Sequence, residues 1–96
     1  MTRILMHFDE TRKVATQYKN CSVEVGQLLT LLKSSQSQLE QSWSGRGFEQ
    51  FQIQFNELVP NIVSFQRLLE DISTFLRQSA DVLEDADNRI MASLKR

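Results

Sequence analysis

The sequence predicts an all-α protein: an antiparallel helix-turn-helix hairpin that dimerises into a four-helix bundle. Three observations predict this fold. Two long segments carry apolar residues at alternating three- and four-residue steps, which place them on one side of a helix. A glycine-containing segment separates the two. The 96 residues include 41% hydrophobic residues, three Gly and one Pro, a composition typical of a helical chain that forms a single domain, 1–96.

The first segment, about 9–42, is expected to be a helix. Asp9 and Glu10 would lie in its first turn, where carboxylates interact favourably with the helix dipole. Gly26 costs about 1 kcal/mol relative to Ala inside a helix, which either marks the close approach of a neighbouring helix or is merely tolerated. The residues of the apolar stripe are Val14, Tyr18, Cys21, Val25, Leu28, Leu32, Ser35, Leu39 and Ser42. A second row adjoins it: Ala15, Leu29, Gln36 and Trp43.

A turn is expected at 43–46, because the glycines at 45 and 47 interrupt the helical pattern. Gly45 can take a positive φ that other residues resist. Trp43 can pack its indole against the end of the hairpin. A loop with an anchoring aromatic residue is one interpretation of this segment.

The second helix is expected over about 47–90. Its apolar row repeats at three- and four-residue steps: Phe48, Phe51, Phe55, Leu58, Ile62, Phe65, Leu69, Ile72, Leu76, Ser79, Leu83, Ala86 and Ile90. Leu68, Phe75 and Val82 widen this face. Pro60 removes one helical hydrogen bond, yet the row continues in phase across it. The sequence therefore predicts a kink near Asn56 and no end to the helix.

Both apolar faces are wider than a single helix pair can cover. Two antiparallel helices contact each other along one line, so large side chains would remain in water unless two hairpins pair. The residues expected in the core or the dimer interface are Val25, Leu28, Leu32, Leu39, Phe48, Phe51, Phe55, Leu58, Ile62, Phe65, Leu69, Ile72 and Leu76. Dimerisation is the expected way to cover them.

Several functions are disfavoured by the composition. A net charge of −1, with Lys and Arg spread along the chain, provides no basic patch for nucleic acid. The short apolar run at the N-terminus and the absence of a long apolar segment predict neither a cleaved signal peptide nor a membrane span. The single Cys21 cannot form an intramolecular disulfide.

No catalytic or metal site is expected. The only His, at position 7, and Cys21 belong to different kinds of site, so they do not form a nucleophile and base pair. Acidic residues near 70 and 84–87 have no His or Cys at ligand spacing, which favours a solvated helix face. We therefore expect no enzyme activity and no cofactor.

The turn Trp43-Ser44-Gly45, placed mid-chain between two heptad-patterned helices, resembles the WXG family of Esx-type type VII secretion substrates. The resemblance covers essentially the whole chain. It includes the segment 39–55, the proline after Asn56-Glu57-Leu58, and the stretch 68–70.

The C-terminal segment 83–96 also resembles the export signal of that family. The signal is a hydrophobic residue, an acid four positions later, and hydrophobic residues three and seven positions after the acid: Leu83, Asp87, Ile90 and Leu94. On a helix these four residues lie near one side, an arrangement that a receptor groove can read. Many family members have Tyr at the position of Leu83. The alternative interpretation is a plain continuation of the core pattern.

This resemblance implies a folded dimer, formed with an identical chain or a related WXG protein. The signal at 83–94 would lie beside Trp43 of the other subunit, and an FtsK/SpoIIIE-type ATPase would bind both. The protein would then be secreted without a cleaved signal peptide, as an effector or as a co-secreted component. Two alternatives remain open: an intracellular helical adaptor or chaperone that binds a partner helix, and a membrane-active effector.

Overall fold

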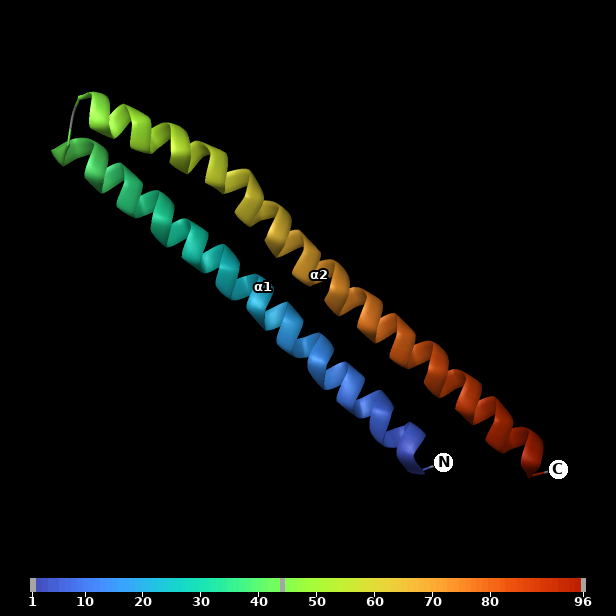
Figure 1. The fold of residues 1–96 in the computed structure, drawn as a ribbon. Helices are drawn as coiled ribbons and strands as arrows, with labels where there is room; N and C mark the ends of the chain where they lie inside the picture. Colours follow the sequence, from blue (N-terminus) through green and yellow to red (C-terminus); the bar gives the residue numbers. More distant parts are fainter. Residues whose placement is uncertain (1, 44, 96) are drawn as a thin grey trace.

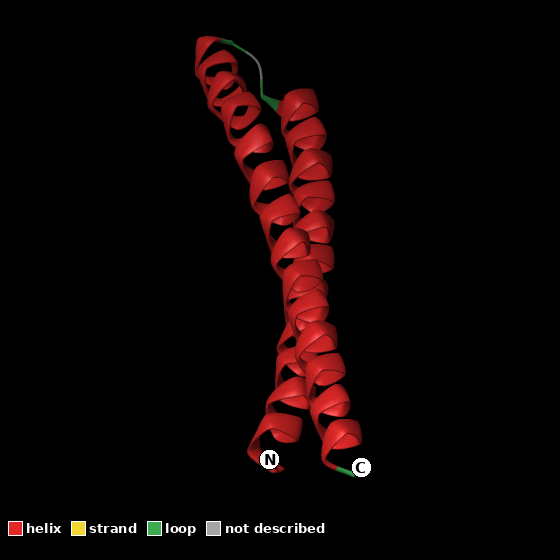
Figure 2. Cartoon of the chain, turned by 90° about the vertical axis from the view of Figure 1, so that its right-hand side faces the viewer, coloured by secondary structure: helices red, strands yellow, loops and turns green. Residues whose placement is uncertain are grey.

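The computed structural model describes the backbone of residues 2–43 and 45–95, and the side chains of residues 8–43 and 45–95. Two helices, α1 (Thr2–Ser42) and α2 (Arg46–Leu94), make up nearly all of this part. They lie side by side and antiparallel, with both termini at one end (Figure 1). The molecule is a rod of 78 × 16 × 14 Å. The described part contains helix and loop and no strand (Figure 2), which confirms the expected all-α hairpin.

Both helices extend beyond the expected ends. α1 begins at Thr2, so Asp9 and Glu10 lie inside the helix and not in its first turn. α2 continues to Leu94, so most of the expected C-terminal tail is helical. Neither extension contains Gly or Pro, and no residue there interrupts the helix. Ser44 of the expected turn and Arg96 of the expected tail lie outside the described residues.

Small and polar residues fill much of the interface between the helices. On α1 the buried residues recur every seven positions, and so do those near the C-terminal end of α2, which places each set on one line along its helix. We call these lines the inner rows: Phe8, Ala15, Ser22 and Leu29 on α1, and Ser73, Ala80 and Asp87 on α2. The Ser73 hydroxyl donates to the carbonyl of Ala15 at 2.7 Å, and the Ser22 hydroxyl donates to that of Gln66 at 3.2 Å. Short side chains bring each hydroxyl within reach of the opposite backbone.

Ion pairs join the helices along one side of the hairpin. The Arg12 guanidinium reaches Asp81 and Glu84, both at 2.9 Å, and Lys19 lies 3.5 Å from Glu70. We call this the polar side, and it comprises Arg12, Thr16, Lys19, Glu70, Arg77, Asp81 and Glu84, with Arg77 donating to the Thr16 hydroxyl at 2.8 Å.

Pro60 lies inside α2 without ending it, as expected. Proline cannot donate a hydrogen bond to the carbonyl of Asn56. Both residues are exposed, so water can satisfy this carbonyl. In Figure 1 the ribbon of α2 bends in its yellow part, the segment around this proline.

Gly26 lies beneath the side-chain amide of Gln66. A Cβ atom at this position would come within 2.6 Å of Gln66 Nε2. The atoms that it would meet belong to the flexible end of the Gln66 side chain and not to the backbone of α2, so this contact does not select between the two interpretations of this glycine.

Candidate functional site

Large apolar side chains remain exposed along one side of the hairpin. On both helices the residues of the polar side follow the inner row by four positions, as Lys19 follows Ala15 and Arg77 follows Ser73, or by one. Most of the large exposed apolar residues instead precede the heptad positions of the inner row by one, as Leu28 precedes Leu29, or follow them by three, as Leu32 follows Leu29, which turns them to its other flank. Phe75 and Val82 follow Ser73 and Ala80 by two positions, which turns them further away from α1. Because the helices are antiparallel, equivalent flanks of the two lie on the same side. We call it the apolar side: Cys21, Leu28 and Leu32 of α1, and Phe51, Leu58, Phe65, Leu68, Phe75 and Val82 of α2.

The residues predicted to lie in the core or the dimer interface differ in their burial within one hairpin. Phe48 and Leu69 are buried within the hairpin. Six are half-buried: Val25, Leu39, Phe55, Ile62, Ile72 and Leu76. Five are exposed on the apolar side: Leu28, Leu32, Phe51, Leu58 and Phe65. One hairpin therefore covers only part of the apolar pattern.

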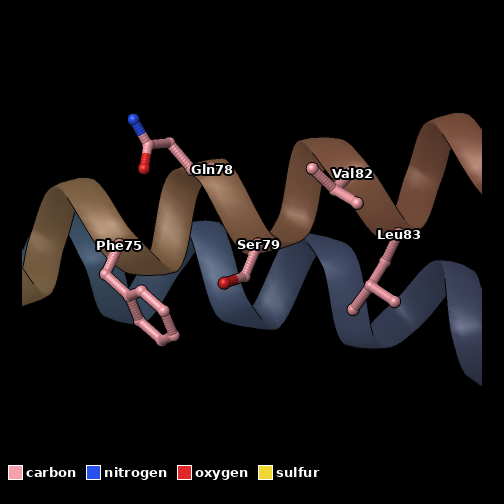
Figure 3. A pocket seen from close by; sticks show the side chains of 5 residues that line it. All are labelled: Phe75, Gln78, Ser79, Val82 and Leu83. Atoms are coloured by element: carbon pink, nitrogen blue, oxygen red, sulfur yellow. The ribbon is translucent and has the colours of Figure 1, made fainter.

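A shallow hollow of about 390 Å³ lies near the C-terminal end of the apolar side. Figure 3 shows Phe75 and Leu83 projecting from α2 in the same direction, with Ser79 between them. Gln78 and Val82 complete its lining. The hollow is mostly apolar, so an apolar side chain of a partner fits it better than a charged group.

The turn end of the hairpin is built around Trp43. Its ring meets Phe48 edge-on, with centroids 5.8 Å apart, and lies 6.2 Å from Phe51. Gly45 has φ 113° and ψ −172°, a conformation essentially restricted to glycine, which confirms the expected positive φ. The Trp43 N–H donates to the carbonyl of Leu39 at 2.8 Å, so the residue continues the last turn of α1. Trp43 remains 41% exposed.

The expected export signal is helical, and its members differ sharply in exposure. Leu83, Ile90 and Leu94 are 58%, 53% and 71% exposed. Asp87 is only 8% exposed, because it lies on the inner row of α2. Trp43 lies at the turn end of the rod and the signal at the end with the termini (Figure 1), so one hairpin does not bring them together.

Arg12 forms the main charged contacts near the expected export signal. Its hydrogen bonds to Glu84 and Asp81 raise the pKa of the guanidinium above its ordinary value, which keeps it charged. The hydrogen bond from Arg12 lowers the pKa of the Glu84 carboxyl. The cluster of Arg12, Asp81 and Glu84 joins α1 to α2 within one turn of Asp87, a member of the expected export signal.

Sequence reasoning found only part of the inner rows: it placed Ala15 and Leu29 in a second row beside the apolar stripe and missed the inner row of α2. The sequence pattern that could have identified the inner row of α2 is the recurrence of small or polar residues at seven-residue steps through Gln66, Ser73 and Ala80. Such residues permit close helix contact but contribute little to a hydrophobic pattern, so the larger apolar residues beside them dominated the prediction.

Two further properties bear on function. Within residues 2–43 and 45–95, neither helix has a stretch long and apolar enough to cross a membrane. The same part of the chain holds no cluster of three or more His, Cys, Asp or Glu residues that could bind a metal ion.

Comparison with known proteins identifies the family. The model of WXG100, "Proteins of 100 residues with WXG", matches residues 3–88. An ESAT-6-like protein of Streptococcus agalactiae serotype V is 37% identical over 94 residues, covering 98% of each chain. Type VII secretion system extracellular protein A of Staphylococcus aureus is 31% identical over 90 residues, covering 94% of this chain and 93% of that protein.

A solved structure shares the fold as well. EsxA of Geobacillus thermodenitrificans (crystal form I) superposes with a TM-score of 0.86 at 32% identity, covering 93% of this chain and 98% of that one. Family, fold and the Trp43-Ser44-Gly45 turn agree: the chain belongs to the WXG100 family, which contains extracellular proteins of type VII secretion systems.

Proposed function

We propose that the chain is exported by a type VII secretion system as a folded dimer, either as an effector or as a co-secreted component. The observation that carries this proposal is the apolar side. Exposed Leu28, Phe65 and Phe75 lie on one face of a rod that is too thin to bury them. A large exposed apolar surface of this kind is typical of a protein interface. The similarity of this chain to an extracellular protein of a type VII secretion system supports its export.

The partner is a second copy of this chain or a related WXG protein. Pairing two hairpins along their apolar sides forms a four-helix bundle and removes these residues from water. An antiparallel pairing also places the turn end of one subunit beside the signal end of the other. Trp43 of one chain then lies near Leu83, Ile90 and Leu94 of its partner.

This arrangement gives a two-part export signal that only a folded dimer presents. The exposed Trp43 ring and the exposed C-terminal leucines and isoleucine supply apolar contacts. Asp87 supplies the charge. An FtsK/SpoIIIE-type ATPase is the proposed receptor, and the exported protein needs no cleaved signal peptide. The family is one of secreted helical proteins and not of enzymes, so binding is the proposed activity.

Export of point variants tests this function. W43A and D87N are compared with D71N, which changes an exposed carboxylate of the same helix. The ratio of secreted to cytoplasmic protein is measured by immunoblotting in a host that carries the secretion system. Both signal variants should lower the ratio at unchanged helical content, and D71N should not. Normal export of folded W43A and D87N would refute the proposed signal, whereas retention of all chains, wild type included, would favour an intracellular adaptor.

A further inference from the structure

A row of large apolar side chains runs along the part of α2 that is turned away from α1. Leu68, Phe75 and Val82 follow one another at seven-residue steps, which keeps them on one line of the helix. They are 53%, 66% and 67% exposed, so water reaches more than half of each residue. We call this line the outer row. An exposed apolar surface of this length is typical of a binding site.

The corresponding line of α1 is mostly polar. The outer row follows the inner row of α2 by two positions, as Phe75 follows Ser73. The residues that follow the inner row of α1 by the same step are Glu10, Gln17, Glu24 and Leu31. Packing within the hairpin therefore does not require apolar residues at this rotation, and those of α2 are available for another contact.

The hollow of about 390 Å³ is part of the outer row. Four of the residues that line it, Phe75, Gln78, Ser79 and Val82, occupy positions i, i+3, i+4 and i+7 of one helix. In a coiled coil, four neighbouring residues of a helix form the hole that receives one side chain of the facing helix. Figure 3 shows the short Ser79 side chain between Phe75 and Leu83, which leaves this hole open. The hollow therefore fits a side chain that another helix presents.

An acidic border accompanies the outer row on its side away from Phe65. It consists of the exposed residues three positions after those of the outer row: Asp71, Gln78 and Asp85. Asp85 lies 3.1 Å from Arg89, and both side chains of this pair are more than half exposed, so the pair contributes little. Among the described residues Asp71 makes no ion pair. A partner that complements this border carries positive charge.

The proposed dimer leaves one flank of the outer row free. Phe65 lies on the flank of α2 that meets a second hairpin, whereas Phe75 is turned further from α1. A second hairpin on the apolar side therefore covers Phe75 from the flank of Phe65 only. A further copy docked antiparallel on the outer row would set its own carboxylates against the acidic border. This repulsion disfavours a further copy as the occupant of the outer row.

We propose that the outer row of α2 is a docking surface for an amphipathic helix of another protein. That helix carries an apolar stripe at heptad spacing, with Lys or Arg along the edge that faces Asp71 and Asp85. One of its apolar side chains occupies the hollow beside Ser79, and others lie against Leu68 and Val82. The contact is a helix laid into a groove, a common mode of peptide recognition. It goes beyond the proposed export function, because it gives the folded protein a second partner.

Fluorescence anisotropy with two labelled peptides tests this surface on the whole chain. Each peptide has about 18 residues and is stapled into a helix, because short isolated helices are marginal in water. Both carry Leu along one stripe; one has Lys along the adjoining edge, and the other has Glu at the same positions. The Lys peptide should bind saturably and at least about tenfold more tightly than the Glu peptide. Equal affinities, or no saturable binding of the Lys peptide, would overturn the proposal.

Two Phe→Ala variants separate the outer row from the dimer interface. F75A should weaken binding of the Lys peptide by about tenfold or more and change the dimer dissociation constant by less than about threefold. F65A is the matched control, because Phe65 is 52% exposed on the same helix. It should weaken the dimer and preserve peptide binding. Equal loss of peptide binding in both variants would place the peptide on the dimer interface. Assemblies larger than the dimer that F75A abolishes in sedimentation would identify a further copy as the occupant. Either result would overturn the proposal.

A charge reversal tests the acidic border separately. D71K should weaken binding of the Lys peptide by about threefold or more and strengthen binding of the Glu peptide. E24K makes the same change of charge at an exposed position of α1 and should leave both affinities within about twofold of the wild type. Equal effects of D71K and E24K would show that only net charge matters, which contradicts a docking site at this border.

Discussion

Gly47 lies directly against the indole ring of Trp43. A Cβ atom at position 47 would come within 2.8 Å of Trp43 Cζ2, closer than a carbon contact allows. The two glycines near this turn, Gly45 and Gly47, therefore have different structural roles. Gly45 provides a backbone conformation, and Gly47 provides room for the ring that gives the turn its shape.

Substitution at the two glycines should separate these tasks. G47A should displace the indole and shift the emission of the only tryptophan. It should change the free energy of unfolding by no more than about 1 kcal/mol, because Ala is the better helix former. G45A should destabilise by about 1–3 kcal/mol, because its φ and ψ are unfavourable for Ala. Fluorescence and urea unfolding measure both effects, and an unchanged emission spectrum in G47A would contradict the contact.

The buried hydroxyl of Ser73 should contribute measurably to stability. It donates to the Ala15 carbonyl at 2.7 Å in the interface between the helices. S73A should lower the free energy of unfolding by about 1 kcal/mol, the usual contribution of such a bond. S64A makes the same change at an exposed position of α2 and should alter stability by no more than about 0.5 kcal/mol. Equal urea midpoints for the two variants would show that this bond is unimportant.

The hairpin itself was predictable, because long heptad patterns on both sides of a glycine turn admit few other folds. The turn was equally readable from Trp43 and Gly45. The sequence did not predict which face of each helix meets the other helix. The apolar arc of each helix spans more than one contact line, and the pattern alone does not say which edge faces the other helix and which faces a partner.

The exposure of the residues in the proposed export signal was unpredictable for a related reason. Spacing places Leu83, Asp87 and Ile90 near one side of a helix, but a small rotation decides which of them meets α1. That rotation depends on the hydroxyl and ion-pair contacts of Ser73 and Arg12. These contacts connect residues far apart in the sequence, so no local pattern reports them.

The proposed dimer should be sensitive to charge on the apolar side alone. F65E places a carboxylate among residues that a partner would bury. Losing about 1.5–3 kcal/mol in each subunit should raise the dimer dissociation constant by about 10²–10⁴-fold. V63E is the matched control, because Val63 is an exposed residue seven positions before Glu70 on the polar side. Sedimentation should show F65E monomers that remain helical, and a dimer unaffected by F65E would place the interface elsewhere.

Acid should weaken the hairpin partly through Glu84. Its pKa is lowered in the folded protein by the hydrogen bond from Arg12. A carboxyl with a depressed folded pKa contributes stability above its unfolded pKa and loses it as the pH falls through the folded value. Between about pH 6 and pH 3, E84Q should therefore lose less stability than the wild type. E57Q removes an exposed carboxylate of α2 and should retain the wild-type slope. Identical slopes for E84Q and wild type in urea titrations would argue against the pairing.

Pro60 should reduce the stability of α2 while giving it its bend. The helix is continuous here, so Ala at this position can donate the hydrogen bond to Asn56 that proline lacks. Both residues are exposed to solvent, so no side chain of α1 needs to move when Ala replaces Pro60. P60A should therefore raise the free energy of unfolding by about 1–3 kcal/mol, up to the full cost of proline in a helix interior. N61A, at the exposed neighbouring position, should change stability by less than about 0.5 kcal/mol. If P60A instead lowers stability, the bend itself must be needed for the two helices to remain in register.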